Sequence, residues 1–185
     1  MISQTDISVS TQPIAGILDA LDFAAVKHRD QRRKNEDASP YINHPIAVAK
    51  IICAEAGIDD PIVLCAALLH DTIEDTNTTL SELGDRFGPT VADVVQEVTD
   101  DKTLPKLERK RAQIEHASTL STTAKLVKLA DKIANLRDVA YDPPHDWSLE
   151  RRQEYFDWAK AVVDGLRGCS SALESLFDEA YEARP

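Results

Sequence analysis

The sequence has no apolar run long enough to cross a bilayer, which takes about 20 residues in a helix. The segment from Met1 to Gln12 lacks the basic start and the apolar core of a secretory signal, so secretion is not expected. Cysteine is scarce, and Cys53, Cys65 and Cys169 form no closely spaced pair. Cys53 and Cys65 lie in apolar runs and are predicted to be small core residues. These absences indicate a cytoplasmic protein without disulfides.

Positive charge is in the minority. The 185-residue chain has 21 lysines and arginines against 32 aspartates and glutamates, which gives a formal net charge of −11. This balance argues against a general binder of nucleic acid or of anionic membranes. A polyanionic substrate would therefore need a local basic pocket on an otherwise acidic protein.

Strand-like alternation and internal repeats are also absent. Apolar residues recur instead at spacings of three and four, and glycine and proline fall at the ends of the apolar segments. With 43% apolar and 29% charged residues, the composition is ordinary for a globular domain. We expect an all-α, single-domain helical bundle of about eight or nine helices over residues 13–185, preceded by a loose tail at residues 1–12.

Capping signals mark where several of these helices begin. Asn43 and Asp60 each precede a proline that fits the first turn of a helix. Thr79 and Glu82 have the spacing of a capping box, and Ser148 precedes another apolar helical stripe. We therefore expect helices to begin at these points.

The most informative stretch runs from Leu68 to Asp75, where an apolar segment ends in the letters HDTIED. On one continuous helix, His70 and Glu74 share a face, as do Asp71 and Asp75. Burying unpaired carboxylates is costly unless a cation compensates. The pattern favours a helix that binds a metal ion through His70 and Asp71. Glu74 and Asp75, one turn further along, would then act on a water molecule beside that ion. Taken alone, a charged helix end is just as typical of a solvated surface.

Two residues distant in the chain have matching chemistry. His44 lies at the start of a predicted helix, where its side chain can turn into a cleft. Asp131 lies on a polar stripe flanked by leucines, although an ion pair with Lys128 or Lys132 would also explain it. Two imidazoles and two carboxylates suit a divalent transition ion with coordination left open for water and substrate. Oxygen ligands favour manganese, iron or magnesium, and zinc stays open.

Residues 29–34 form a basic cluster at a predicted helix end, and residues 106–111 form a predicted helix with a strongly basic side. From charge alone, the first is explained as a solvated helix end, where cations also suit the helix dipole, and the second as a solvated helix face. Contact with phosphate is the functional alternative.

Longer sequence words around these residues resemble one family. YINHP (41–45), ALLHDTIED (67–75) and VKLADK (127–132) resemble the hydrolase domain of the Rel/Spo alarmone enzymes, within the HD-domain phosphohydrolase superfamily. TDDKTLPK (99–106) and QEYF (153–156) look closest to the stand-alone small alarmone hydrolases of the metazoan SpoT homologue type. The resemblance spans roughly residues 21–168, and the family fold is all-α.

The resemblance implies a manganese-dependent hydrolase that removes the 3′-pyrophosphate of guanosine tetraphosphate or pentaphosphate. It assigns the metal ligands to His44, His70, Asp71 and Asp131. It assigns activation of the water to Glu74 and Asp75. It assigns substrate contacts to Arg33, Lys34, Lys106, Asn135 and Tyr155.

The charge balance and the resemblance together set expectations about partners and alternatives. No synthetase or regulatory domain is expected, and neither nucleic acid nor a membrane is an expected partner. A homo-oligomer is one option for the assembly. The alternative activity is that of an HD phosphohydrolase acting on another nucleotide phosphate, such as a dinucleotide 2′-phosphate or a deoxynucleoside triphosphate. A non-catalytic alarmone-binding protein is disfavoured, because all the ligands and the acidic pair are present.

Overall fold

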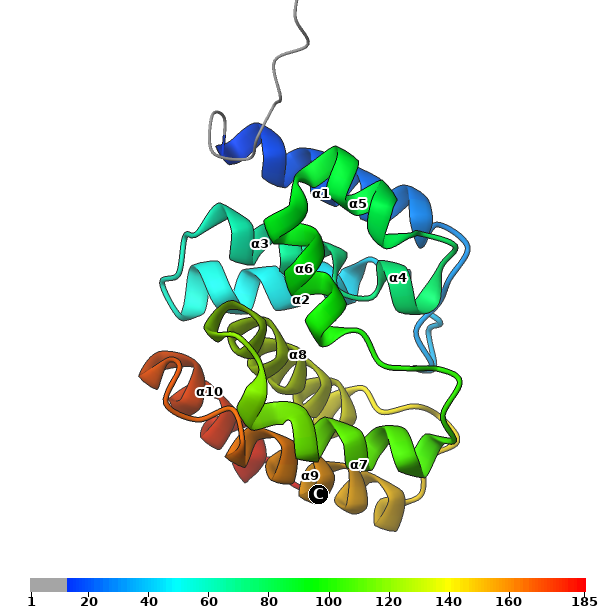
Figure 1. Cartoon of the computed structure of the whole chain (residues 1–185). Helices are drawn as coiled ribbons and strands as arrows, with labels where there is room; N and C mark the ends of the chain where they lie inside the picture. The colour runs from blue at the N-terminus through cyan, green and yellow to red at the C-terminus, as the bar shows by residue number, and fades with distance from the viewer. Residues whose placement is uncertain (1–12) are drawn as a thin grey trace, which may run out of the picture.

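The computed structural model describes residues 13–185, and its regular elements in that range are all helical, which confirms the all-α prediction (Figure 1). The predicted tail at residues 1–12 lies outside the described residues. The α-helices are α1 (Pro13–Lys27), α2 (Asn43–Lys50), α3 (Pro61–Leu69), α4 (Thr72–Asp75), α5 (Leu80–Phe87), α6 (Pro89–Val98), α7 (Lys106–His116), α8 (Thr122–Tyr141), α9 (Leu149–Asp164) and α10 (Ser171–Glu182). A π-helical turn, η1 (Ile51–Glu55), extends α2, and a 3-10 turn, η2 (Ala117–Thr119), follows α7.

Helix α3 is the centre of the fold. Every residue from Val63 to Leu69 is buried, and α3 packs against α1, α2, α6 and α8. A helix that is apolar on all sides must be enclosed by other elements. Figure 1 shows this enclosure, with α1 and α5 on one side of α3 and α8 and α10 on the other. The buried run therefore delivers its last residues into the interior.

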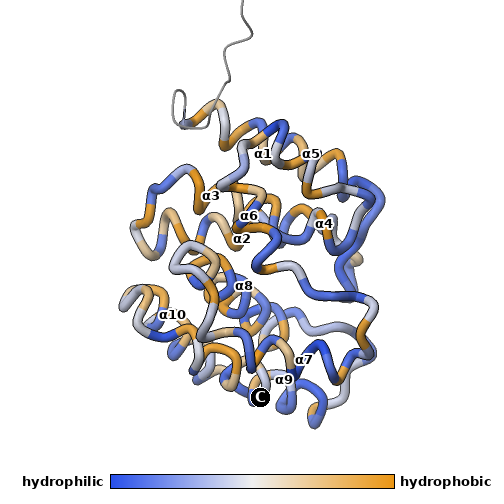
Figure 2. The backbone as a smooth tube through the Cα atoms, in the orientation of Figure 1, coloured by the Kyte–Doolittle hydropathy of each residue, from blue (hydrophilic) through white to orange (hydrophobic). Residues whose placement is uncertain are grey.

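Helix α8 is the second organising element. It packs against α2, α3, α6, α9 and α10, and it carries buried residues along most of its 20-residue length. Two connections run past its polar side, the one between α1 and α2 and the one between α6 and α7. Figure 2 shows that the chain is mostly hydrophilic on the side of the molecule where these connections lie. The two connections contact α8 through Arg33 with Asp138 and through Asp100 with Lys128.

Most predicted caps are present. The side chains of Asp60, Thr79 and Ser148 each accept a backbone N–H from the first turn of α3, α5 and α9 respectively. The prediction for Asn43 was wrong, because Asn43 is already inside α2 and the preceding residue Ile42 has helical dihedral angles. No side chain caps α2, since the turn before it winds directly into the helix.

The cysteine expectations were partly right. Cys65 is fully buried in α3, as expected, but Cys53 is exposed because it lies on the outer side of the π-helical turn η1. All three cysteines are free thiols. None of the helices formed by residues 13–185 is both long enough and apolar enough to cross a membrane.

Two glycines should respond to alanine in opposite directions. A Cβ atom at Gly165, the C-cap of α9, would lie 2.8 Å from the Cβ of Ala117, so we expect Gly165→Ala to destabilise the fold by about 1–3 kcal/mol. At Gly84, within α5, the added atom meets only Ala92, at 3.9 Å. Gly84→Ala should stabilise the protein by up to about 1 kcal/mol through helix propensity. Thermal melts of both variants test the pair, and equal melting temperatures would contradict the packing described here.

Candidate functional site

The HD motif follows the end of α3 and is not part of one continuous helix, so the sequence prediction was wrong on this point. Nδ1 of His70 donates to the carbonyl of Ala67 at 2.7 Å, and the hydroxyl of Thr72 donates to the carbonyl of Leu69 at 2.7 Å. These side chains satisfy carbonyls in the last turn of α3, which have no partner within the helix. Helix α3 ends at Leu69, and His70 and Asp71 lie in the junction before α4.

Four side chains from three parts of the fold meet beside this junction. His44 comes from the first turn of α2 and Asp131 from α8, and one ligand atom each of His44, His70 and Asp131 lies within 4.8 Å of the other two. Asp131 Oδ1 is 3.1 Å from His44 Nε2 and 3.8 Å from His70 Nε2. Asp71 Oδ2 adjoins them, 3.1 Å from His70 Nε2 and 3.9 Å from His44 Nε2. We call these four residues the ligand cluster.

The hydrogen bonding of His70 suits a metal ligand. Because Nδ1 donates to Ala67, the neutral ring presents a lone pair at Nε2. This Nε2 atom is buried and has no hydrogen-bond partner in the part of the chain that the structure describes, although the Asp71 carboxylate lies beside it. Two electron-pair donors this close need a proton or a metal ion between them. The donor set of two imidazoles and two carboxylates fits a divalent ion.

The crowding also sets the charges of the ligand cluster. Burial lowers the pKa of His70, but the carboxylates of Asp71 and Asp131 outweigh it and raise that pKa to about 9. Burial raises the pKa of Asp71, whereas the imidazoles of His70 and His44 hold it well below its usual value. Burial opposes ionisation of Asp131 too, yet Lys132 and His44 keep its pKa well below the ordinary range. The carboxylates are therefore ionised, and either a protonated imidazole or a metal ion must supply positive charge among them.

Further side chains orient the carboxylate ligands. The hydroxyl of Tyr41 donates to Asp71 Oδ2 at 2.5 Å. The side-chain amide of Asn135 donates to Asp131 Oδ1 at 2.6 Å, and the Lys132 ammonium lies 3.0 Å from Asp131 Oδ2. Such partners fix the direction of ligand lone pairs and thereby support a metal site.

Glu74 extends from α4 into a mixed environment. Its Oε2 accepts the backbone N–H of Asp100 at 3.3 Å, and its Oε1 lies 3.7 Å from Arg109 and 3.9 Å from Lys102. Burial raises the pKa of Glu74 to about 7, and the carboxylates of Asp100 and Asp71 add to the effect. A carboxyl group with a pKa near neutrality is suited to accept a proton from water at physiological pH.

Glu74 and Asp75 together are called the acidic pair. Both carboxylate oxygens of Asp75 contact a neighbouring side chain. The side-chain amide of Gln31 donates to its Oδ2 at 2.8 Å, and the ammonium of Lys102 contacts its Oδ1. The two partners come from different connections, one between α1 and α2 and the other between α6 and α7.

Two cavities share a wall at this site. The smaller, of about 190 Å³, is lined by the whole ligand cluster and by Glu74. The larger, of about 660 Å³, includes Asp75 in its wall and falls in the size range of small-molecule sites. The residues that line both cavities include Tyr41, His44, Asn135 and Tyr155.

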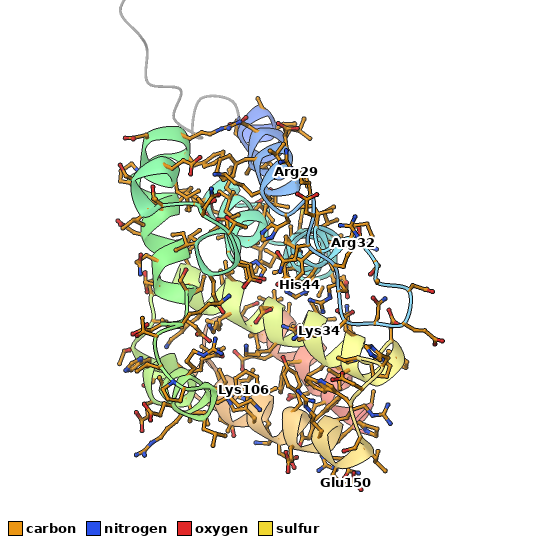
Figure 3. The ribbon with its side chains drawn as sticks, turned by 90° about the vertical axis from the view of Figure 1, so that its right-hand side faces the viewer. Arg29, Arg32, Lys34, His44, Lys106 and Glu150 are labelled. Carbon is orange, nitrogen blue, oxygen red and sulfur yellow. The ribbon has the colours of Figure 1, made fainter. Side chains whose placement is uncertain are left out.

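The structure separates the expected substrate contacts into two groups. Arg33, Lys34, Asn135 and Tyr155 line the larger cavity, whereas Lys106 lines neither cavity. Lys106 is the exposed first residue of α7. Figure 3 labels it beside that helix, below His44 and Lys34. The fold therefore brings four of these five residues to the site.

Sequence reasoning missed two lysines in the smaller cavity. Lys128 and Lys132 are both buried, and the Lys132 ammonium lies 4.7 Å from the ring centroid of Trp158. The sequence indicates them only as ion-pair partners of Asp131. Lys128 instead donates to the carbonyl of Val98 at 2.9 Å. The signal that could have found Lys128 is its place on the same polar stripe as Asp131, and no such signal marks Lys132, which directly follows Asp131.

Comparison with known proteins places the chain in a family. Residues 20–157 match the HD domain family, and the chain belongs to it. It is 59% identical over 165 residues to the guanosine-3′,5′-bis(diphosphate) 3′-pyrophosphohydrolase MESH1 of Xenopus tropicalis, which covers 89% of this chain and 92% of that protein. Human MESH1 is 58% identical over 170 residues, covering 92% and 95% of the two chains.

A solved structure gives the same relationship. Described as a metazoan ortholog of SpoT that hydrolyzes ppGpp and plays a role in starvation responses, it matches with a TM-score of 0.89 and 52% identity. The match covers 92% of this chain and 96% of the other. The resemblance to stand-alone alarmone hydrolases is thereby confirmed.

In the metal-free protein, we expect one glutamate carboxyl to titrate near pH 7, because burial and neighbouring carboxylates disfavour the charged form of Glu74. Carboxyl ¹³C NMR of protein labelled in glutamate would follow it, and the signal should be missing in Glu74→Gln. Titration of every glutamate below about pH 5.5 would contradict the described environment.

The same shift has a consequence for stability. The unfolded-state pKa of a glutamate is 4.5, so the contribution of neutral Glu74 to folding is fully present below that pH and is lost as the pH rises to about 7. Metal-free Glu74→Gln should therefore gain melting temperature relative to the wild type as the pH rises through this window.

Proposed function

We propose that the protein hydrolyses the 3′-pyrophosphate of guanosine tetraphosphate or pentaphosphate, consuming one water molecule and releasing pyrophosphate with GDP or GTP. The observation that carries this proposal is the ligand cluster, with an acidic pair beside it and a cavity of nucleotide size adjoining it. The similarity to MESH1 proteins over most of both chains supports the choice of substrate.

The metal would be held by His44, His70, Asp71 and Asp131. Manganese is the ion we propose, because nitrogen and oxygen ligands without thiolate suit it and because the family resemblance implies it. When bound, such an ion supplies positive charge that acidifies a water molecule and neutralises the attacked phosphate. The hydrogen bonds from Tyr41 and Asn135 orient the carboxylates toward it.

The acidic pair activates and orients the attacking water molecule. Glu74 lines the same small cavity as the ligand cluster, and with a pKa near 7 it can accept a proton from water there. Asp75 faces the larger cavity and orients the water from the other side. Positioning and charge stabilisation are the main requirements of phosphoryl chemistry, and fixed carboxylates meet the first of them.

The larger cavity would take the nucleoside. Arg33 and Lys34 give it a basic wall, and Asn135 and Tyr155 line the side shared with the ligand cluster. Arg33 is half-buried, contacts Asp138 and lies 5.6 Å from the centre of the Tyr41 ring. This arrangement supplies cations for a polyanionic substrate in a wall that also contains Asp75, Asp138 and Asp142.

The proposal also includes the location of the protein and its partners. We propose a cytoplasmic location, with which three free cysteines agree. We propose no nucleic-acid partner, and a homo-oligomer stays a prediction from the resemblance.

Incubation with guanosine tetraphosphate and Mn²⁺ should release pyrophosphate, and chelation should stop it. His70→Ala and Asp131→Ala should each abolish turnover and weaken Mn²⁺ binding measured by calorimetry, because each removes a ligand. Arg29→Ala, at an exposed residue paired only with its neighbour Asp30, is the matched surface control and should keep wild-type rates.

A substrate panel separates the alternatives. Turnover of a dinucleotide 2′-phosphate or a deoxynucleoside triphosphate, with none of guanosine tetraphosphate, would contradict the proposal. Full activity of His70→Ala after chelator treatment would contradict the metal assignment.

Arg33 and Lys106 should differ in their effect on substrate binding. A hydrogen bond to a charged group contributes about 1.5–3 kcal/mol, so Arg33→Ala should lower kcat/KM roughly ten- to a hundredfold, mainly through KM. Lys106→Ala should change it less than about threefold, because an exposed charge outside the cavities is screened by solvent. Steady-state kinetics at physiological salt measure both. An equal loss in the two variants would show that Lys106 reaches the phosphates.

A further inference from the structure

Gln31 contacts the acidic pair but has no part in the mechanism described above. Its side-chain Nε2 donates to Asp75 Oδ2 at 2.8 Å, while Lys102 contacts the other oxygen. The side chain of Asp75 is 22% exposed, and each of its two carboxylate oxygens has one of these partners. Figure 1 shows α4, which carries Asp75, on the side of the molecule where the α1–α2 connection runs. A neutral amide thus fixes one carboxylate oxygen without adding charge.

A histidine holds the other end of the Gln31 amide. Gln31 Oε1 lies 2.6 Å from Nδ1 of His28. The Asp75 carboxylate only accepts hydrogen bonds, so the NH₂ group of Gln31 must face it and the amide oxygen must face His28. Because an amide oxygen only accepts as well, Nδ1 of His28 carries the proton and donates it. His28 therefore anchors the end of Gln31 that points away from Asp75.

The side chain of His28 has no other hydrogen-bond partner among residues 13–185. Its side chain is 2% exposed, and its Nε2 atom is buried without a hydrogen-bond partner in that range. Leaving a polar nitrogen buried and unpaired is costly, and an aliphatic residue would avoid that cost. The ring packs against Tyr41, 5.0 Å between centroids, and the one hydrogen bond of the side chain goes to Gln31.

The backbone around Gln31 is held as firmly as its side chain. Its N–H donates to the carbonyl of His28 at 2.9 Å, and its carbonyl accepts the N–H of Tyr41 at 3.1 Å. Tyr41 in turn donates to Asp71 of the ligand cluster. The connection between α1 and α2 thereby links the acidic pair to the ligand cluster through fixed hydrogen bonds.

We propose that Gln31, anchored by His28, is a positioning residue that holds the carboxylate of Asp75 in its working direction. The proposal rests on the catalytic role assigned to Asp75 under the proposed function. Misplacing a reacting group by about 1 Å can cost roughly a hundredfold in rate, and loss of an outer hydrogen bond in a metal site costs about ten- to a hundredfold.

The kinetic test uses Gln31→Ala and the isosteric Gln31→Glu, which sets a like charge against Asp75. Both should lower kcat about ten- to a hundredfold, with KM and Mn²⁺ affinity changed by less than about twofold. His28→Leu should resemble Gln31→Ala, whereas His28→Asn, whose amide can donate from nearly the same place as Nδ1, should recover most of the rate. Gln96→Ala, at an exposed glutamine of α6, is the matched control. Wild-type kcat in Gln31→Ala would overturn the proposal.

A double-mutant cycle shows whether Gln31 acts through Asp75. If it does, Gln31→Ala should slow Asp75→Ala no further than about twofold, because the group being positioned is already gone. If the loss of rate in the double variant equals the product of the two single losses, the proposal is overturned. Wild-type rates in Asp75→Ala would instead refute the catalytic role of Asp75, and slow Asp75→Ala with fast Gln31→Ala would refute the positioning role alone.

A measurement without turnover completes the design. In metal-free ¹⁵N-labelled protein, the side-chain NH₂ signals of Gln31, identified by their loss in Gln31→Ala, should shift in both Asp75→Ala and His28→Leu. They should stay in place in Gln96→Ala. Unchanged signals in the first two variants would show that the hydrogen bonds are absent in solution, whatever the substrate of the protein.

Discussion

Two carboxylates and two imidazoles share a buried site, and this arrangement is stable only if positive charge lies among them. The distances of 3.1 Å from His44 to Asp131 and from His70 to Asp71 leave no room for the groups to avoid one another. Isolated charges cannot be buried at low cost, so the fold must either protonate the imidazoles or bind a cation. The unpaired Nε2 of His70 shows which nitrogen that cation would meet.

The same constraint explains how an acidic protein can accept a polyanion. The chain carries a formal net charge of −11, yet Lys128 and Lys132 are buried in the wall of the smaller cavity and Arg33 lines the larger one. Each of these cations has a carboxylate or carbonyl partner, so their charge is retained where burial would otherwise remove it. Cations are therefore present at the cavities beside the carboxylates that also line them, although the protein as a whole is acidic.

The helices and the ligand cluster could be predicted from the sequence, because periodicity and caps determine helices and because the sequence motifs around His44, His70 and Asp131 are specific. The buried partners of these ligands and of the acidic pair could not be predicted. Lys132 beside Asp131 has the pattern of a surface ion pair, and only the packing of α8 against α9 places it over Trp158. Gln31 likewise lies in a basic stretch that charge alone describes as solvated. Its contact with a residue 44 positions away exists only after the fold has formed.

The break between α3 and α4 shows why the local prediction failed where it mattered. Apolar periodicity and the HDTIED sequence are both compatible with one continuous helix, and dihedral preferences do not separate the two outcomes. At the break, the side chains of His70 and Thr72 donate to the carbonyls of Ala67 and Leu69, which lie in the last turn of α3. The bond from Nδ1 of His70 to Ala67 also fixes the tautomer that directs Nε2 into the ligand cluster.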